Sequence, residues 1–121
     1  MDQATGRKIC ELVAGIIAVD GELHEAENAL LVRLLDKTGL PRGDEVVLAP
    51  VLDAGEAART MRQLPPAVRK EAMALLIEAA VVDGKVVPVE QRYLEAVADA
   101  LGMGQDELEE RVADRLMASR A

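Results

Sequence analysis

Carboxylate residues recur at a fixed distance in this chain of 121 residues. Asp20 is repeated 63 positions later as Asp83, and Glu27 is repeated at the same distance as Glu90. Their surroundings are similar too, because Ala-Val-Asp-Gly in the first copy reads Val-Val-Asp-Gly in the second. A carboxylate at a tight turn can accept backbone hydrogen bonds or bind a hard cation. The chain therefore carries two copies of a motif that could do either.

The spacing within each copy predicts where these side chains point. Each Asp ends one helix, where unpaired backbone carbonyls make the helix end negative. Each Glu falls in the first turn of the next helix, at about the third helical position if His24 and Val87 are the caps. A Glu there can accept a hydrogen bond from the backbone N–H of the cap residue. We therefore expect Glu27 and Glu90 to point toward the preceding helix rather than into water.

Two interpretations of the turns remain open at this point. In the first, the turns are structural: Asp caps the turn, Gly permits its backbone angle, and Glu caps the following helix. In the second, Asp20, Glu22 and Glu27 combine with loop carbonyls to form a site for a divalent cation, Ca²⁺ or Mg²⁺. No other cofactor is indicated.

The first turn is the better candidate for a cation site. Lys85 takes the place of Glu22 in the second copy, and Val87 takes the place of the histidine. Any site formed by Asp83 and Glu90 is therefore expected to be weaker. Neither turn follows the ligand series of an EF-hand.

Helices must position these residues, because apolar side chains recur at three- and four-residue steps along most of the chain. Gly21, Gly39 and Gly102 follow such segments, as glycines commonly do at helix ends. No segment shows the sustained alternation of a strand. The pattern predicts an all-α fold of six to seven helices, over residues 3–19, 25–38, 45–52, 56–63, 66–82, 88–101 and from 105 onward.

The duplication predicts two helical hairpins related by a pseudo-twofold axis. Their expected bounds are about residues 9–40 and 72–103, within a single domain that covers residues 1–121. A chain of this length buries roughly two-thirds of its unfolded surface and needs no disulfide or metal to fold. Cys10 is the only cysteine, so no intrachain disulfide can form, and we expect a buried, inert thiol.

Composition argues against several classes of function. The net charge of −8 and the absence of Phe and Trp, with Tyr93 as the only aromatic residue, argue against nucleic-acid binding. His24 and Cys10 lie at opposite ends of the first hairpin and are too few for a zinc site. The few Ser and Thr residues have no base beside them, which argues against an enzyme.

No apolar run reaches the ~20 residues of a membrane span and no signal peptide is recognisable, so we expect a cytoplasmic protein.

Three motifs together resemble the TerB-like family, the helical domain of tellurite-resistance proteins and of some DnaJ-type co-chaperones. They are residues 19–27, residues 82–90 and the entry into the last helix at residues 101–108. The resemblance covers about Ile9 to Met117. It is fairly specific, because both Asp-Gly motifs occur in the correct order between the expected helices.

The resemblance implies a non-enzymatic helical domain with an acidic surface that binds divalent cations and joins stress-response assemblies near the membrane. The acidic positions that it points to are Asp20, Glu22, Glu27, Asp83 and Glu90. Lys85 departs from this acidic pattern in the second copy.

The function predicted from the sequence is that of an accessory binding module. It would engage a protein partner, with a divalent cation at the first Asp-Gly turn, and would neither bind nucleic acid nor insert into a membrane, although the assembly it joins could be membrane-associated. The alternative is a purely structural or self-associating helical protein whose acidic turns are caps. The scarcity of large apolar residues favours a monomer or a weak dimer.

Overall fold

The computed structural model describes residues 3–19, 21, 25–38, 49–82 and 84–120, and within these ranges it contains six helices and no strand. The prediction of an all-α fold is therefore confirmed. The helices are α1 (Gln3–Ala18), α2 (Glu25–Thr38), α3 (Ala54–Gln63), α4 (Pro66–Val81), α5 (Pro88–Ala100) and α6 (Gln105–Arg120).

The helix boundaries repeat at the same distance as the sequence motifs. α4 begins and ends 63 positions after α1, and α5 begins 63 positions after α2. Both α1 and α4 have 16 residues. The hairpins α1–α2 and α4–α5 thus follow one local plan.

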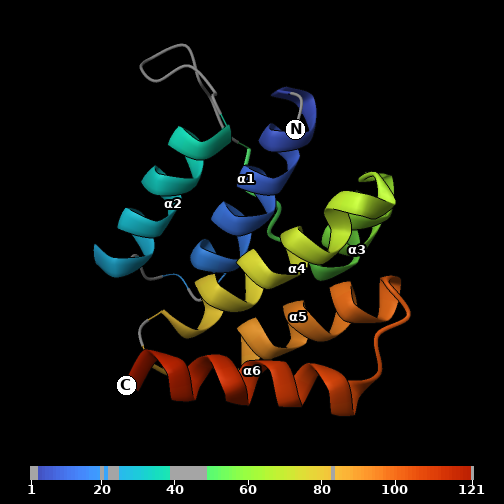
Figure 1. Ribbon diagram of the computed structural model, residues 1–121. Helices are drawn as coiled ribbons and strands as arrows, with labels where there is room; N and C mark the ends of the chain where they lie inside the picture. The colour runs from blue at the N-terminus through green and yellow to red at the C-terminus, as the bar shows by residue number, and fades with distance from the viewer. Residues whose placement is uncertain (1–2, 20, 22–24, 39–48, 83, 121) are drawn as a thin grey trace.

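Small aliphatic side chains fill the interior. α1 packs against α2 and α4, α3 packs mainly against α5, and α6 packs against α4 and α5 (Figure 1). The fully buried side chains include Leu12, Ile16, Leu76 and Leu94, and Cys10 is buried as expected. Burial of each Leu or Ile side chain contributes about 1.5–3 kcal/mol, so the close packing of these helices supplies the main stabilising free energy in the absence of large aromatics.

The helix predicted over residues 45–52 is wrong in its last four residues, and its first four lie outside the described ranges. Residues 49–52, which we call the strap, form no helix and lie across α1. The backbone N–H of Val51 donates to the carbonyl of Glu11 at 3.1 Å, and the N–H of Ala49 donates to Oε2 of Glu11 at 2.8 Å. Pro50 explains the failure, because a proline disfavours helical angles in the residue before it.

The start of α3 also differs from the expectation, which placed it at Glu56. The helix begins at Ala54 because Asp53 is its N-cap, and Oδ2 of Asp53 accepts a hydrogen bond from the N–H of Glu56 at 2.9 Å. Such a side-chain cap satisfies one of the free N–H groups of the first turn. The strap therefore passes directly into a capped helix.

Tyr93 of α5 forms a further hydrogen bond with the strap. Its hydroxyl donates to the carbonyl of Val51 at 2.7 Å and also lies 3.3 Å from the carbonyl of Leu12 on α1. The side chain is fully buried. Burial raises the pKa of the Tyr93 hydroxyl well above its usual range, and the negative charge of Glu56 adds to this effect.

Gly15 gives the strap room to approach α1. A Cβ atom at this position would overlap the carbonyl oxygen of Val51 and would lie 2.8 Å from the hydroxyl of Tyr93. The carbonyl belongs to backbone that is already fixed by two hydrogen bonds, so it cannot move aside without breaking them. The position therefore requires glycine.

Gly15→Ala should lower the free energy of unfolding by about 1–3 kcal/mol, as overpacking typically does in a tight interior. The comparison variant is Gly104→Ala, because a Cβ at Gly104 meets no atom within 4 Å. Gly104 precedes α6 as its N-cap, so this change should cost less than about 1 kcal/mol, from the cap position alone. Urea denaturation of both variants measures the difference. Equal stability of the two variants would contradict the close approach of the strap to α1.

Tyr93→Phe should cost about 1–3 kcal/mol at neutral pH, because the buried carbonyl of Val51 loses its donor. The raised pKa also predicts a pH effect. The folded state holds the hydroxyl proton more tightly than the unfolded state, so this contribution is complete below the ordinary tyrosine pKa of about 10 and is lost as pH rises above it.

Wild type should therefore lose stability above about pH 10 more steeply than Tyr93→Phe. Urea denaturation at several alkaline pH values measures the difference. The absorbance of tyrosinate reports on this residue alone, because the chain has one tyrosine. Parallel pH profiles for the two proteins would show that the hydroxyl pKa is not raised on folding.

Candidate functional site at the Asp-Gly turns

The two Asp-Gly turns share one backbone geometry. The N–H of Gly21 donates to the carbonyl of Ala18 at 3.0 Å, and the N–H of Gly84 donates to the carbonyl of Val81 at 2.8 Å. Both glycines have positive φ angles, 78° and 89°, which L side chains rarely adopt. The expectation that Gly21 is a left-handed residue after the first helix is confirmed, and Gly84 adopts the same conformation in the second copy.

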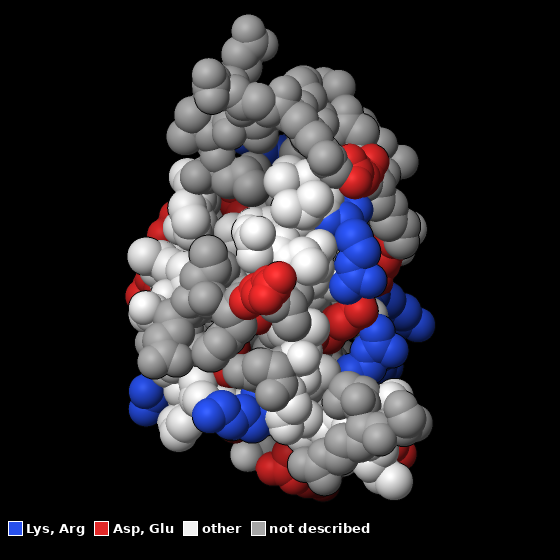
Figure 2. Space-filling view, turned by 90° about the vertical axis from the view of Figure 1, so that its left-hand side faces the viewer, with Lys and Arg blue, Asp and Glu red and all other residues white. Residues whose placement is uncertain are grey.

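Both turns lie on one side of the molecule. The ends of α1 and α4 are found on the left-hand side of Figure 1, where α2 also begins. Figure 2 shows that side face-on, with acidic side chains near the centre of the face and basic side chains along the right-hand edge and at the lower left. The fold therefore brings the two copies of the motif to a common face.

Glu27 and Glu90 are buried, with exposures of 1% and 2%. Within the described ranges they are the only charged residues that are buried. Their burial confirms the part of the expectation that they do not point into water. Their identical position in the two hairpins means that the fold places a buried carboxylate in the first turn of both α2 and α5.

The carboxylate of Glu90 caps α5. Its Oε1 accepts a hydrogen bond from the backbone N–H of Val87 at 3.1 Å, and Val87 is the N-cap residue, as the spacing predicts. Valine has no side-chain oxygen, so the reciprocal bond of a capping box cannot form. One role of Glu90 is therefore structural.

The remaining predicted ligands lie outside the described residues. These are Asp20 and Glu22 of the first turn and Asp83 of the second, and His24, the predicted cap of α2, lies outside them too. Of the predicted set, the structure places only Glu27 and Glu90. Within the described ranges, no group of three or more His, Cys, Asp or Glu side chains is arranged to hold a metal ion.

The two turns differ in the charge beside them. Lys85, which replaces Glu22, is exposed next to Gly84 in the second copy. A lysine at this place adds a positive charge where a bound cation would be repelled. That the first turn is the better cation site stays a prediction from the sequence.

Several hollows lie between α4 and α6, and no pattern in the sequence predicted them. The largest has a volume of about 280 Å³ and includes Lys70, Met73 and Met103 in its lining. The sequence feature that could have indicated them is the presence of Ala74 on α4 and Ala118 on α6. Their small side chains leave space in two of the hollows, which larger side chains would fill. That signal is weak before the neighbouring helix is known.

A family model described as "Tellurite resistance protein TerB" matches residues 7–112. The chain belongs to the TerB family. The match includes both Asp-Gly turns, all of α2 to α5 and parts of α1 and α6, so it confirms the resemblance carried by the motifs. No curated protein and no solved structure gives a significant match. None of the helices in the described ranges is long and apolar enough to span a bilayer.

Substitutions of Glu90 should separate its capping role from its charge. Glu90→Ala removes the acceptor for Val87 and should lower the free energy of unfolding by about 1 kcal/mol or more. Glu90→Gln keeps an oxygen acceptor of similar size and should be much less destabilising. Urea denaturation compares the two. If both variants lose the same stability, the negative charge rather than the hydrogen bond is what the fold requires.

Proposed function

We propose that this TerB-family chain is a non-enzymatic accessory module of a tellurite-resistance or related stress-response assembly. It engages a protein partner and binds a divalent cation, Ca²⁺ or Mg²⁺, at the first Asp-Gly turn. Asp20, Glu22 and Glu27 supply the carboxylate oxygens. The module itself carries no catalytic group.

The burial of Glu27 is the observation that supports the cation site. A carboxylate removed from water costs several kcal/mol unless hydrogen bonds or a cation compensate for its lost hydration. Glu27 already has a partner within the protein, so a cation would add to that contact through the remaining lone pairs of the carboxylate. Glu27 is 1% exposed in the helix turn that follows Gly21, and the intervening turn carries two more carboxylates in sequence. Hard cations such as Ca²⁺ are held by several carboxylate and carbonyl oxygens.

The second turn serves mainly as a cap in this proposal. Oε1 of Glu90 accepts a hydrogen bond from the N–H of Val87, and exposed Lys85 follows Gly84 in the turn. Asp83 and Glu90 would hold a cation more weakly than the first turn. The duplication therefore supplies a built-in control for the cation site.

The alternative function is purely structural or self-associating, with the acidic residues of both turns acting as caps. The hydrogen bond between Glu90 and Val87 favours this alternative for the second turn. The alternative applies to the first turn only if Glu27 also serves as a helix cap. The neutral variant Glu27→Gln can test this.

Titration with CaCl₂ and then MgCl₂, followed by amide NMR, should shift the resonances of Gly21, Glu22 and Glu27 more than those of Gly84 and Glu90. Glu27→Gln should weaken binding by about tenfold or more, because it removes a charge while preserving the acceptor for a cap. Glu90→Gln is the matched control and should change the affinity little.

Asp20→Asn should weaken cation binding to a similar degree, whereas Asp83→Asn should not. In chelator-treated buffer Asp20→Asn should cost little stability. A loss of about 1 kcal/mol or more that is independent of metal would assign Asp20 to capping. No shift at millimolar cation would remove the cation site.

A further inference from the structure

Among the described helices, α2 is the one that is attached to the rest of the protein on a single side. It packs against α1, and no other described helix makes more than a marginal contact with it. Figure 1 shows α2 at the outer edge of the molecule, beside α1. Each of the other five helices packs against at least two neighbours. α2 is therefore the peripheral helix of the fold.

The buried face of α2 is small. Of its described side chains, Glu27, Leu30 and Leu34 are buried, and both leucines keep 5% exposure, whereas Val32 is 39% exposed. α5 is the equivalent helix of the second hairpin, and five of its side chains are at most 2% exposed. Local unfolding occurs most readily where buried apolar contacts are few. We therefore expect α2 to be held in place less firmly than α5.

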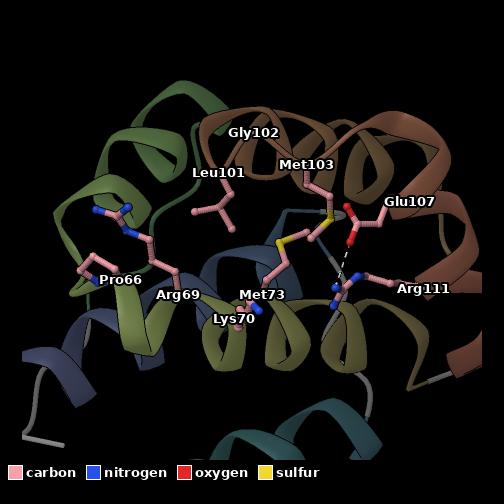
Figure 3. Close-up of a pocket in the computed structure, with 9 residues that line it drawn as sticks. All are labelled: Pro66, Arg69, Lys70, Met73, Leu101, Gly102, Met103, Glu107 and Arg111. Carbon is pink, nitrogen blue, oxygen red and sulfur yellow. Dashed lines mark hydrogen bonds and ion pairs between the residues drawn. The ribbon is translucent and has the colours of Figure 1, made fainter.

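The helices other than α2 are joined to one another at several interfaces. Met73 of α4 and Met103 of the turn between α5 and α6 converge at one of these (Figure 3). At the end of α3, the guanidinium of Arg69 of α4 donates to the carbonyls of Leu64 at 3.0 Å and Arg62 at 2.8 Å. The loss of any one of these helices would break contacts with two or more others. We call α1, α3, α4, α5 and α6 together the body.

Detachment of α2 would also unfold it. The helix has 14 residues, and isolated helices of about 12–15 residues are only marginally stable in water. Its backbone hydrogen bonds would therefore break, and its amide protons would exchange with solvent. α1 is buried at every position from Leu12 to Ile17, so the loss of its cover would expose apolar surface.

We propose that α2 opens as a separate unit while the body stays folded, and that a cation at the first Asp-Gly turn keeps α2 closed. The second half of this inference rests on the function proposed above. Glu27 lies in the first turn of α2, so its carboxylate is positioned only while that turn is helical. A ligand that binds the closed state more tightly lowers the population of the open state. The cation thereby controls how often the apolar side of α1 is uncovered.

The opening is tested first on the wild-type chain, in chelator-treated buffer. Amide hydrogen exchange is followed by NMR at increasing urea concentrations below the unfolding transition. The amides of α2 should be protected about a hundredfold less than the slowest amides of α5. Their exchange should also depend less on urea, because opening of α2 exposes less surface than global unfolding. Equal protection and equal urea dependence of the two helices would show that α2 unfolds only with the whole protein.

Two substitutions distinguish a separate unit from global unfolding. Leu34→Ala removes contacts that only the closed state makes, so it should speed exchange about tenfold or more in α2 and in α5 alike. Leu34→Val, a milder change, should act in the same direction. Val112→Ala lies in α6, which packs against α4 and α5 and weakens the body whether α2 is closed or open. It should speed exchange in α5 and leave α2 unchanged, and equal acceleration of both helices would contradict the proposal.

Addition of CaCl₂ tests the control by the cation. At ten times the dissociation constant, a cation that binds only the closed state slows opening about tenfold. Exchange in α2 should therefore slow by this factor. Glu27→Gln should lose most of the effect, and Glu90→Gln, the matched control in the second copy, should keep it.

Two further outcomes separate this inference from the cation site itself. Amide shifts at Gly21 with slower exchange in α5 but not in α2 would show that the site persists when α2 opens, which would overturn the control by the cation. Neither shifts nor slower exchange at millimolar cation would remove the cation site and the control together. The opening of α2 is measured without cation, so it stands or falls on the urea series and on Val112→Ala.

Discussion

The hydrogen bond from the Tyr93 hydroxyl to the carbonyl of Val51 fixes the strap between the two hairpins, whose helices α1 and α4 also pack directly against each other. It joins α5 of the second hairpin to the strap, and the strap is itself bonded to α1 of the first hairpin. Gly15 makes the arrangement possible, because any side chain at that place would occupy the position of the carbonyl. A polar contact in the interior is worth more than at the surface, since an unpaired buried carbonyl is costly.

The duplicated halves share their backbone plan and differ in the residues that contact their surroundings. Tyr93 corresponds to Leu30, and both are buried, but only the tyrosine carries a hydroxyl that can hold the strap. Gly15 corresponds to Glu78, which pairs with Arg115 of α6. Equivalent faces of α1 and α4 are therefore covered differently, one by the strap and the other in part by α6. Divergence at a few positions has given two copies of one hairpin different neighbours.

Local patterns predicted most of the fold. Apolar periodicity and the glycines after α1 and α4 located the helices, and the offset of 63 predicted two buried glutamates in equivalent turns. The strap could not be predicted, because the groups that bond to it are distant in sequence: Val51 bonds to Glu11 and Tyr93. The hollows between α4 and α6 were also missed, since the space beside Ala74 exists only once α6 is packed against α4. Of the carboxylates predicted to bind a cation, the structure describes only Glu27 in the first copy and Glu90 in the second, and the others lie outside the described residues.

The sole aromatic ring of the chain lies at the junction of the two hairpins. Its ultraviolet emission therefore arises from a single fluorophore with no tryptophan background. Loss of the strap would change the polarity and the hydrogen bonding around that one ring. The molecule thus carries an intrinsic optical reporter at the contact that unites its halves, and separation of the hairpins can be followed without any added label.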